Sequence, residues 1–198
     1  MMDAVLSTFL KPLIGILDAV RILLAVIVCI LPIIFRYISK GKRAFSKLDE
    51  LFIFMSSLPG GRFIFNRLLL WITSTYTETV RPTVTKLTPS GATVFVDNQV
   101  WMRNPFNSIH ALALGNLAEM STGLAVICAT QHRKGVRAIP TRINLEYLKK
   151  ARGRITATSK VALPSVSGPY DCVAELTNSQ GEVVCKGTVT WQVSVKDS

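Results

Sequence analysis

One acidic residue stands inside a long apolar stretch. Residues 109–128, IHALALGNLAEMSTGLAVIC, contain no lysine or arginine, and Glu119 is their only acid. Buried carboxylates are rare unless they are paired or functional. If the stretch is helical, four small or polar residues surround Glu119 and line a groove: Gly115, Asn116, Thr122 and Gly123. Glu119 is therefore a candidate general base or nucleophile. A structural acid bonded to Asn116, to Thr122 or to an arginine of the sheet fits the same pattern.

Further polar groups precede Glu119. His110 lies nine residues before it, and nine helical residues turn through about 900°, which places the two side chains on opposite sides of one helix. Either His110 lies before the helix begins, or it meets Glu119 of another subunit. Asn104, in the turn RNPFNSIH, could orient a carbonyl by hydrogen bonding. Backbone N–H groups at the helix start, around His110 and Ala111, could stabilise an oxyanion.

The elements that must position these residues are mostly strands. Period-two patterns predict strands over residues 92–104, 136–148, 154–163, 170–177 and 182–195. The last is the clearest, because Val189, Trp191 and Val193 fall on one face and polar residues on the other. One helix among long antiparallel strands predicts an α+β domain with the helix packed on one sheet face. The small residues of that helix would let the sheet wrap closely around it.

The first part of the chain is different. Residues 22–35, ILLAVIVCILPIIF, carry no charge, and the apolar character extends back to residue 12. A bilayer span takes about 20 such residues, so residues 12–35 predict a tilted or broken membrane helix, or an anchor lying in the membrane plane. A helical hairpin buried against a partner protein is the alternative. We divide the chain into a membrane-associating extension, residues 1–56, and a domain, residues 57–198.

The charge balance narrows the possible partners. The chain has 23 Lys and Arg residues, 12 Asp and Glu residues and a net charge of +11. The basic residues that follow the apolar segment (Arg36, Lys40, Lys42, Arg43 and Lys47) would place the domain in the cytosol or the mitochondrial matrix, with the mitochondrial inner membrane as one host. Aromatic and basic residues do not interleave as nucleic-acid binding requires. The four cysteines and two histidines lack metal-ligand spacing, so we predict no metal site.

The run RNPFNSIHALALGNLAEMSTGLA resembles the signature of hotdog thioesterases of the phenylacetic-acid-degradation type. In that signature an Asn is followed six residues later by His-Gly-Gly, and an acid follows nine residues after the His. Asn104, His110 and Glu119 keep both spacings. Four stretches in order resemble the uncharacterised DUF4442 branch of that superfamily: PGGR (59–62), TVRPTVTKLTPSGATV (79–94), NSIHALALGNLAE (107–119) and LEYLKKARG (145–153).

This resemblance covers about residues 57–195 and implies a hotdog fold, in which an antiparallel sheet wraps around one long buried helix. It implies at least a dimer that hydrolyses or binds acyl thioesters of coenzyme A, with two subunits contributing to each site. Coenzyme A is then part of the substrate, and no separate cofactor is expected. By the resemblance, Glu119 activates water or attacks the thioester. Asn104 and His110 position the thioester or water, and the Ala111 amide serves the oxyanion.

The chain departs from the signature at two places. Ala111-Leu112 replaces the Gly-Gly after the histidine, which would narrow the substrate channel, and the acid is Glu where Asp is usual. Residues 133–154 hold eight basic residues against one acid, Glu146. Five of these basic residues are candidates for binding the phosphates of coenzyme A: Arg137, Arg142, Lys149, Lys150 and Arg152. A strand edge protected by charge explains them equally well.

Two functions therefore stay open. The first is a membrane-associated acyl-CoA thioesterase that uses Glu119. The second is a hotdog protein without turnover, which binds acyl groups or serves as an accessory subunit of a membrane complex, for example in mitochondria. The altered Gly-Gly and the long apolar segment suit the second. A surface groove that leads to Glu119 would favour the first.

Overall fold

A computed structural model describes residues 47–69 and 74–196 of the chain. The predicted membrane segment, residues 12–35, lies outside these residues. Ser46–Ser198 form one compact unit, which begins before the boundary that we expected at residue 57. The reason is helix α2 (Leu48–Ser57), whose Phe52 side chain is buried in the core of the domain.

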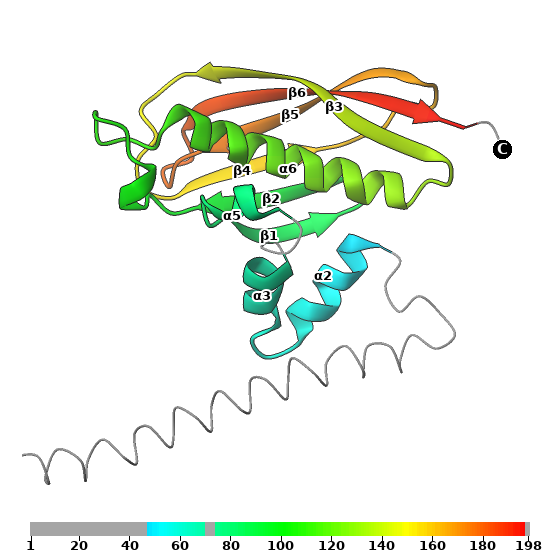
Figure 1. The fold of residues 1–198 in the computed structure, drawn as a ribbon, viewed down its shortest axis with the longest axis horizontal. Helices are drawn as coiled ribbons and strands as arrows, with labels where there is room; N and C mark the ends of the chain where they lie inside the picture. Colours follow the sequence, from blue (N-terminus) through cyan, green and yellow to red (C-terminus); the bar gives the residue numbers. More distant parts are fainter. Residues whose placement is uncertain (1–46, 70–73, 197–198) are drawn as a thin grey trace, which may run out of the picture. The chain divides into compact units, whose positions relative to one another are not determined.

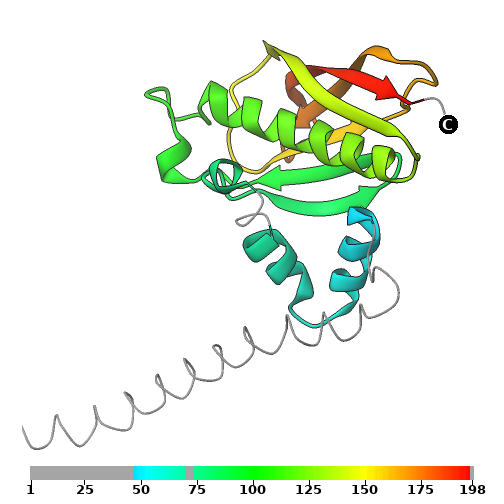
Figure 2. The same cartoon turned by 45° about the vertical axis from the view of Figure 1, so that its right-hand side comes forward.

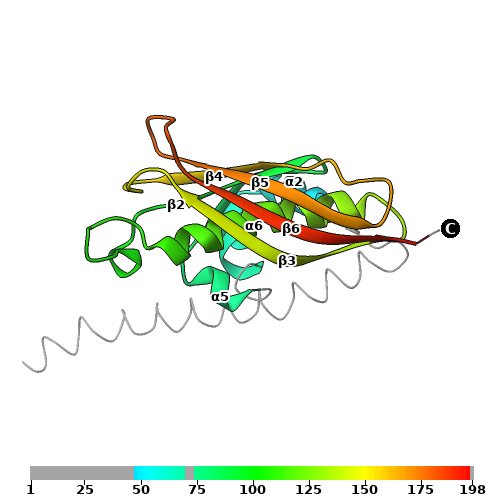
Figure 3. The same ribbon diagram turned by 90° about the horizontal axis from the view of Figure 1, so that it is seen from above.

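Six antiparallel strands form one sheet in the order β1-β2-β4-β5-β6-β3 (Figures 1 and 3). The strands are β1 (Thr83–Thr88), β2 (Gly91–Val96), β3 (Val136–Tyr147), β4 (Ile155–Lys160), β5 (Gly168–Thr177) and β6 (Val183–Val195). In β6 the predicted alternation is confirmed, since Val189, Trp191 and Val193 are buried and the residues between them face outward.

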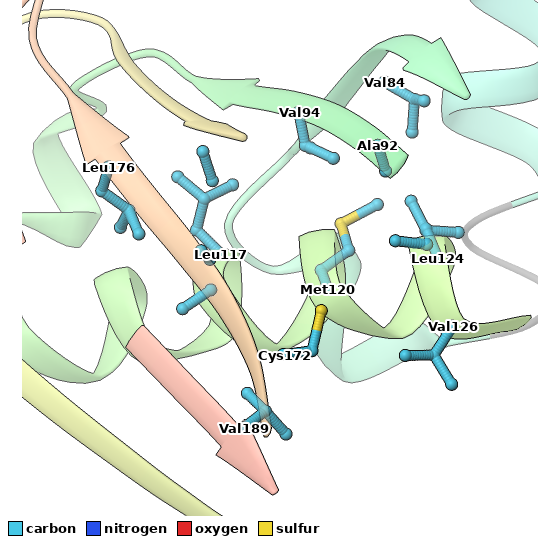
Figure 4. Close-up of a cluster of buried hydrophobic side chains, with 14 of the residues drawn as sticks. Val84, Ala92, Val94, Leu117, Met120, Leu124, Val126, Cys172, Leu176 and Val189 are labelled. Carbon is cyan, nitrogen blue, oxygen red and sulfur yellow. The ribbon is translucent and has the colours of Figure 1, made fainter. Parts of the chain in front are cut away.

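Helix α6 (Ala111–Gln131) packs along one face of this sheet, as Figure 1 shows. It is the one helix of the described residues that is long and apolar enough to cross a membrane, but 72% of its apolar window is buried inside the domain. Leu117, Met120 and Leu124 of this helix gather with side chains of β1, β2, β5 and β6 (Figure 4). The predicted α+β arrangement, an antiparallel sheet around a buried helix, is thus confirmed.

Small residues set the distance between α6 and the sheet. A Cβ at residue 115 would lie 2.9 Å from Leu145 Cδ1, and a Cβ at residue 187 would lie 2.5 Å from Ala118 Cβ. Both separations are shorter than packed carbon atoms adopt. Gly115 and Gly187 therefore let the helix approach β3 and β6 closely, as the composition of the helix predicted.

Two strand predictions differ from the structure. The strand expected over residues 92–104 ends at Val96, and a short 3-10 helix, η2 (Val100–Met102), follows. The prediction was wrong there because Asp97 and Asn98 disfavour strand conformation. Strand β1 was not predicted, since its six residues lie between Pro82 and Pro89 and offer a short pattern. The two strands form a hairpin that supplies one edge of the sheet.

That edge is covered by the helices before it. These are α2, the short α3 (Gly61–Ile64) and the π-helical turn η1 (Phe65–Leu69), which lie beside β1 in Figure 2. The buried Asn66 side chain accepts a hydrogen bond from Val84 N (2.6 Å) and donates one to Val84 O (3.3 Å). It therefore satisfies backbone groups of β1 as a further strand would. The short helix α5 (Thr75–Glu78) completes the described elements.

The opposite edge, β3, has no such cover among the described residues. Its twelve residues are almost all exposed, including Ile139 and Ile143. Along this edge, the backbone N–H and C=O groups of β3 that point away from β6 meet no further strand of the described residues. Exposed apolar side chains lie on the same strand. An edge of this kind is suited to pair with another strand.

Candidate functional site

Glu119 lies in the middle of α6, where the side chain is half-buried. No described residue gives its carboxylate a hydrogen bond or an ion pair. Burial raises the pKa of the Glu119 carboxyl above its ordinary value, because the charged form loses contact with water. The alternative was a structural acid held by Asn116, Thr122 or an arginine, and the described residues contain no such bond to the Glu119 carboxylate. The Thr122 hydroxyl donates to the backbone carbonyl groups of Ala118 and Glu119 instead.

The Trp191 indole closes one side of this site. A Cβ at residue 123 would lie 3.6 Å from Glu119 Oε1 and 3.6 Å from Trp191 Cη2. Gly123 thus leaves a gap between the carboxylate and the indole of β6. Burial removes water from the carboxylate without a compensating partner, and this loss of hydration raises the pKa of Glu119.

Two buried polar atoms near this site have no hydrogen-bond partner among the described residues. They are Asn116 Oδ1, one helical turn before Glu119, and Trp191 Nε1. Buried polar groups almost always find a partner. One acceptor and one donor are therefore available to a bound water or ligand beside Glu119.

Asn104 shapes the loop that leads into α6. Its Oδ1 accepts hydrogen bonds from Phe106 N (3.0 Å), Ser108 N (3.2 Å) and Ser108 Oγ (3.1 Å). The oxygen is therefore occupied in holding the loop. The Nδ2 amide has no partner among the described residues and is the part of Asn104 that can donate to a carbonyl.

His110 is the N-cap of α6. Its Nδ1 accepts a hydrogen bond from Leu112 N at 3.2 Å, so a neutral ring carries its proton on the exposed Nε2. Ala111 is the first residue of the helix, and no described residue accepts from its N–H. This free donor at the positive end of a 21-residue helix can stabilise an oxyanion, as the resemblance implied.

A pocket of about 380 Å³ lies at this helix start. It brings the predicted Asn104 and Ala111 together with Lys149 and Lys150. Tyr147, which no sequence pattern indicated, also lines it and donates a hydrogen bond to Ala111 O at 3.2 Å. Glu119 is not among the lining residues.

The five basic residues predicted to bind phosphates do not form one cluster. Arg137 and Arg142 of β3 lie opposite Ser194 and Thr190 of β6, and paired residues share a sheet face. That face is the outer one, away from α6. Lys149 and Lys150 line the pocket, and Lys149 also pairs with Glu182. Arg152 donates to Phe106 O at 3.4 Å, so it lies beside the loop of Asn104.

Within one chain, the candidate residues form two groups along α6. Asn104, His110 and Ala111 stand at its N-terminus, and Glu119 stands nine residues on, about 13 Å along the axis. The nine-residue spacing predicts this separation. The sequence does not place Trp191 beside Glu119, because the alternation in β6 indicates that Trp191 points inward but not which helix residue it meets.

Comparisons with known proteins add to this geometry. A family model described as "Domain of unknown function (DUF4442)" matches residues 61–193. None of the curated proteins matches the sequence at a significant level.

Solved structures share the fold. The genomics structure APC5556 aligns with a TM-score of 0.65 and 21% identity over 75% of this chain and 98% of its own. A Pseudomonas aeruginosa protein of unknown function, described as "Probable Thioesterase", aligns with a TM-score of 0.58 and 19% identity over 70% and 97%. A Staphylococcus aureus thioesterase aligns with a TM-score of 0.52 and 17% identity over 61% and 99%. At these identities the likeness shows the hotdog fold alone.

Proposed function

The chain belongs to the DUF4442 family, and from that premise we propose that it is a membrane-associated thioesterase that hydrolyses acyl thioesters of coenzyme A with Glu119 as base or nucleophile. The observation that carries this proposal is the Glu119 carboxylate itself. It is half-buried and unpaired within the described residues, and it lies across Gly123 from an indole. A structural acid in that position would leave a burial cost without a compensating partner. Two structural relatives are named as a probable thioesterase and a thioesterase, which supports thioesters as the substrate class of the proposal.

The reaction follows from the available groups. As a base, the Glu119 carboxylate takes a proton from water, and the water oxygen adds to the thioester carbonyl carbon. The oxyanion that forms accepts from the Ala111 N–H. The carbon–sulfur bond then breaks, and the thiolate of coenzyme A leaves and takes up the proton. As a nucleophile, the Glu119 carboxylate would attack the thioester carbonyl carbon, and the carbon–sulfur bond would break to give an anhydride and the thiolate of coenzyme A. Water would then hydrolyse the anhydride, which releases the fatty acid and restores the carboxylate, and the proton from water would go to the thiolate.

The separation of Glu119 from the helix start implies that two subunits build one site. We propose a homodimer in which β3 of each subunit meets β3 of the other. Glu119 of one subunit would then face Asn104, His110 and Ala111 of the partner subunit. Lys149, Lys150 and Arg152, near the helix-start pocket, would bind the phosphates of coenzyme A. Arg137 and Arg142, on the outer face, would be remote from that pocket.

The proposed membrane attachment uses residues 12–35. Their apolar run and the basic residues that follow it support a span or in-plane anchor, with the domain in the cytosol or the mitochondrial matrix. The mitochondrial inner membrane is one membrane that this orientation fits. Substrates made from membrane lipids would then lie close to the site.

One observation favours a second candidate, a hotdog accessory subunit without turnover. The residue after Ala111 is Leu112 in place of glycine, and its side chain is 66% exposed beside the helix start. Such a side chain can occupy the space that an acyl thioester needs. The protein would then act as an accessory subunit of a membrane complex.

The test is thiol release from acyl-CoA thioesters of graded chain length by the full chain in mild detergent. We expect Glu119→Gln to lower kcat/KM by about 100-fold or more, the usual contribution of a general base. Glu175→Gln is the matched control, because this exposed acid lies on β5, away from the proposed β3 interface. If a folded dimer releases no thiol from any substrate, the protein is the accessory subunit.

A further inference from the structure

The helical hairpin before β1 carries exposed apolar side chains that the fold does not use. Ile53, at the centre of α2, is 61% exposed, and Phe63, in α3, is 70% exposed. Leu58 and Ile64 are exposed as well. We call these four residues the hairpin ridge. In Figures 1 and 2, α2 and α3 stand beside β1 and extend away from the sheet, so the ridge occupies a projecting part of the domain.

The hairpin is held in place by other residues. Phe52 and Phe65 are buried and meet edge to face, with ring centroids 5.0 Å apart. At the other end, Asp49 bonds to His132 at the end of α6, with Oδ2 and Nε2 2.9 Å apart. These contacts anchor the two helices from within. The apolar ridge therefore does not serve the packing of its own domain.

The turn between the helices fixes the shape of the ridge. Gly60 has a φ of 72°, which a residue with a side chain adopts only with strain. A Cβ at Gly61 would collide with the backbone carbonyl of Met55. Two glycines thus hold α3 tightly against the end of α2, and the exposed side chains sit on a preformed surface.

Charge around the ridge points to the occupant. Of the acids in residues 47–64, Asp49 is buried and Glu50 pairs with Lys47 at 3.0 Å. Arg62, beside Phe63, is exposed and has no acidic partner among the described residues. The sequence immediately before α2 supplies five basic residues between 36 and 47 and no acid. Exposed apolar side chains with a cationic border suit an anionic lipid surface.

Chain continuity brings the ridge within reach of a bilayer. Ile53 lies eighteen residues after Phe35, the last residue of the uncharged run. That length of chain spans at most about 60 Å when extended. We propose that the hairpin ridge inserts into the interfacial layer of an anionic membrane and so fixes which side of the domain faces the lipid. This inference rests on the membrane association proposed above and adds a second contact, made by the folded domain.

The test places a fluorophore on the ridge of the full chain. Phe63→Cys carries an environment-sensitive label, and Val173→Cys, an exposed apolar position on β5, is the matched control. Cys29→Ser is present in both variants, and the three described native cysteines are buried. Vesicles contain phosphatidylcholine with or without phosphatidylglycerol, plus a lipid that carries a quencher at a shallow acyl position.

We expect the label at residue 63 to lose about half of its emission in anionic vesicles, because such ridges lie about 5–10 Å into the boundary layer. The label at residue 173 should keep its emission. If the protein floats with the vesicles but residue 63 is not quenched, the ridge inference is wrong while the anchor stands. If residue 63 is shielded without lipid as protein concentration rises, a second copy is the occupant and the inference is overturned. If the protein does not float with the vesicles, both membrane proposals are wrong. The result of the thiol-release assay does not depend on this outcome.

Discussion

The role proposed for Glu119 depends on the surroundings of its carboxylate more than on a sequence motif. Its carboxylate is ionisable, half-buried and without a described partner, and the Trp191 indole lies across Gly123 from it. A carboxylate with a raised pKa is a stronger base at neutral pH than an exposed one. The sequence located this acid, because a single charge in an apolar helix is conspicuous. It could not locate Trp191, since a contact between distant elements has no periodic signal.

The raised pKa predicts a pH-dependent effect on stability. The folded state favours protonated Glu119 more than the unfolded state does, so the ionised group costs stability once the pH exceeds the folded pKa. Glu119→Gln should therefore raise Tm by a few degrees at about pH 8. The gain should shrink as the pH falls through the folded pKa and vanish below the ordinary carboxyl range of about 4.3. Thermal unfolding across this pH series checks the sign. If the gain in Tm instead became larger as the pH fell, a partner group would be stabilising the ionised Glu119 carboxylate.

The elements of the fold were predicted unevenly. The predicted helix over residues 109–128 matches α6, and four predicted strands match β3 to β6 within a few residues. Of those elements, α6, β3, β5 and β6 have ten or more residues and carry clear periods. β1 and the end of β2 were missed because a six-residue strand between prolines has little periodicity, and because Asp97 and Asn98 stop the pattern. No sequence pattern indicates that Asn66 covers the β1 edge, since its hydrogen bonds are to backbone groups eighteen residues away.

Asn66 supplies a test at this scale. Asn66→Ala leaves the buried N–H and C=O of Val84 without their partner, and unsatisfied groups of this kind cost about 2–3 kcal/mol. Asn98→Ala, which removes only an exposed bond from Arg103, should change stability by less than about 0.5 kcal/mol. Urea unfolding in mild detergent compares the two midpoints. Equal effects would mean that the Asn66 bonds do not hold the hairpin to the sheet.

At the scale of the molecule, the two sheet edges differ. β1 is covered by Asn66 and its helices, whereas β3 is open within the described residues. This difference is why a dimer through β3 is the assembly that we propose. The sequence suggested shared sites through the nine-residue spacing of His110 and Glu119 and through the family resemblance. The open edge itself required the strand order, which no local pattern contains.

Shared sites make a quantitative prediction. Glu119→Gln and His110→Ala subunits should each form inactive homodimers. When they are coexpressed in equal amounts, half of the dimers are mixed, and each mixed dimer keeps one intact site of two, which restores about a quarter of parental activity. Thiol release by the coexpressed pair measures this fraction. Ile143→Asp, on the open β3 edge, should abolish both the dimer and the recovered activity. Activity in either homodimer would show that its site does not need both residues.

The strand order also has a consequence during translation. Helix α6 is complete at Gln131, but β5 and β6, which cover it, come from the last part of the chain. At a synthesis rate of about 5–20 residues per second, several seconds pass between the completion of α6 and that of β6. By length and composition it resembles a membrane span. Until β5 and β6 have been made, this apolar helix therefore lacks the strands that bury it in the folded domain.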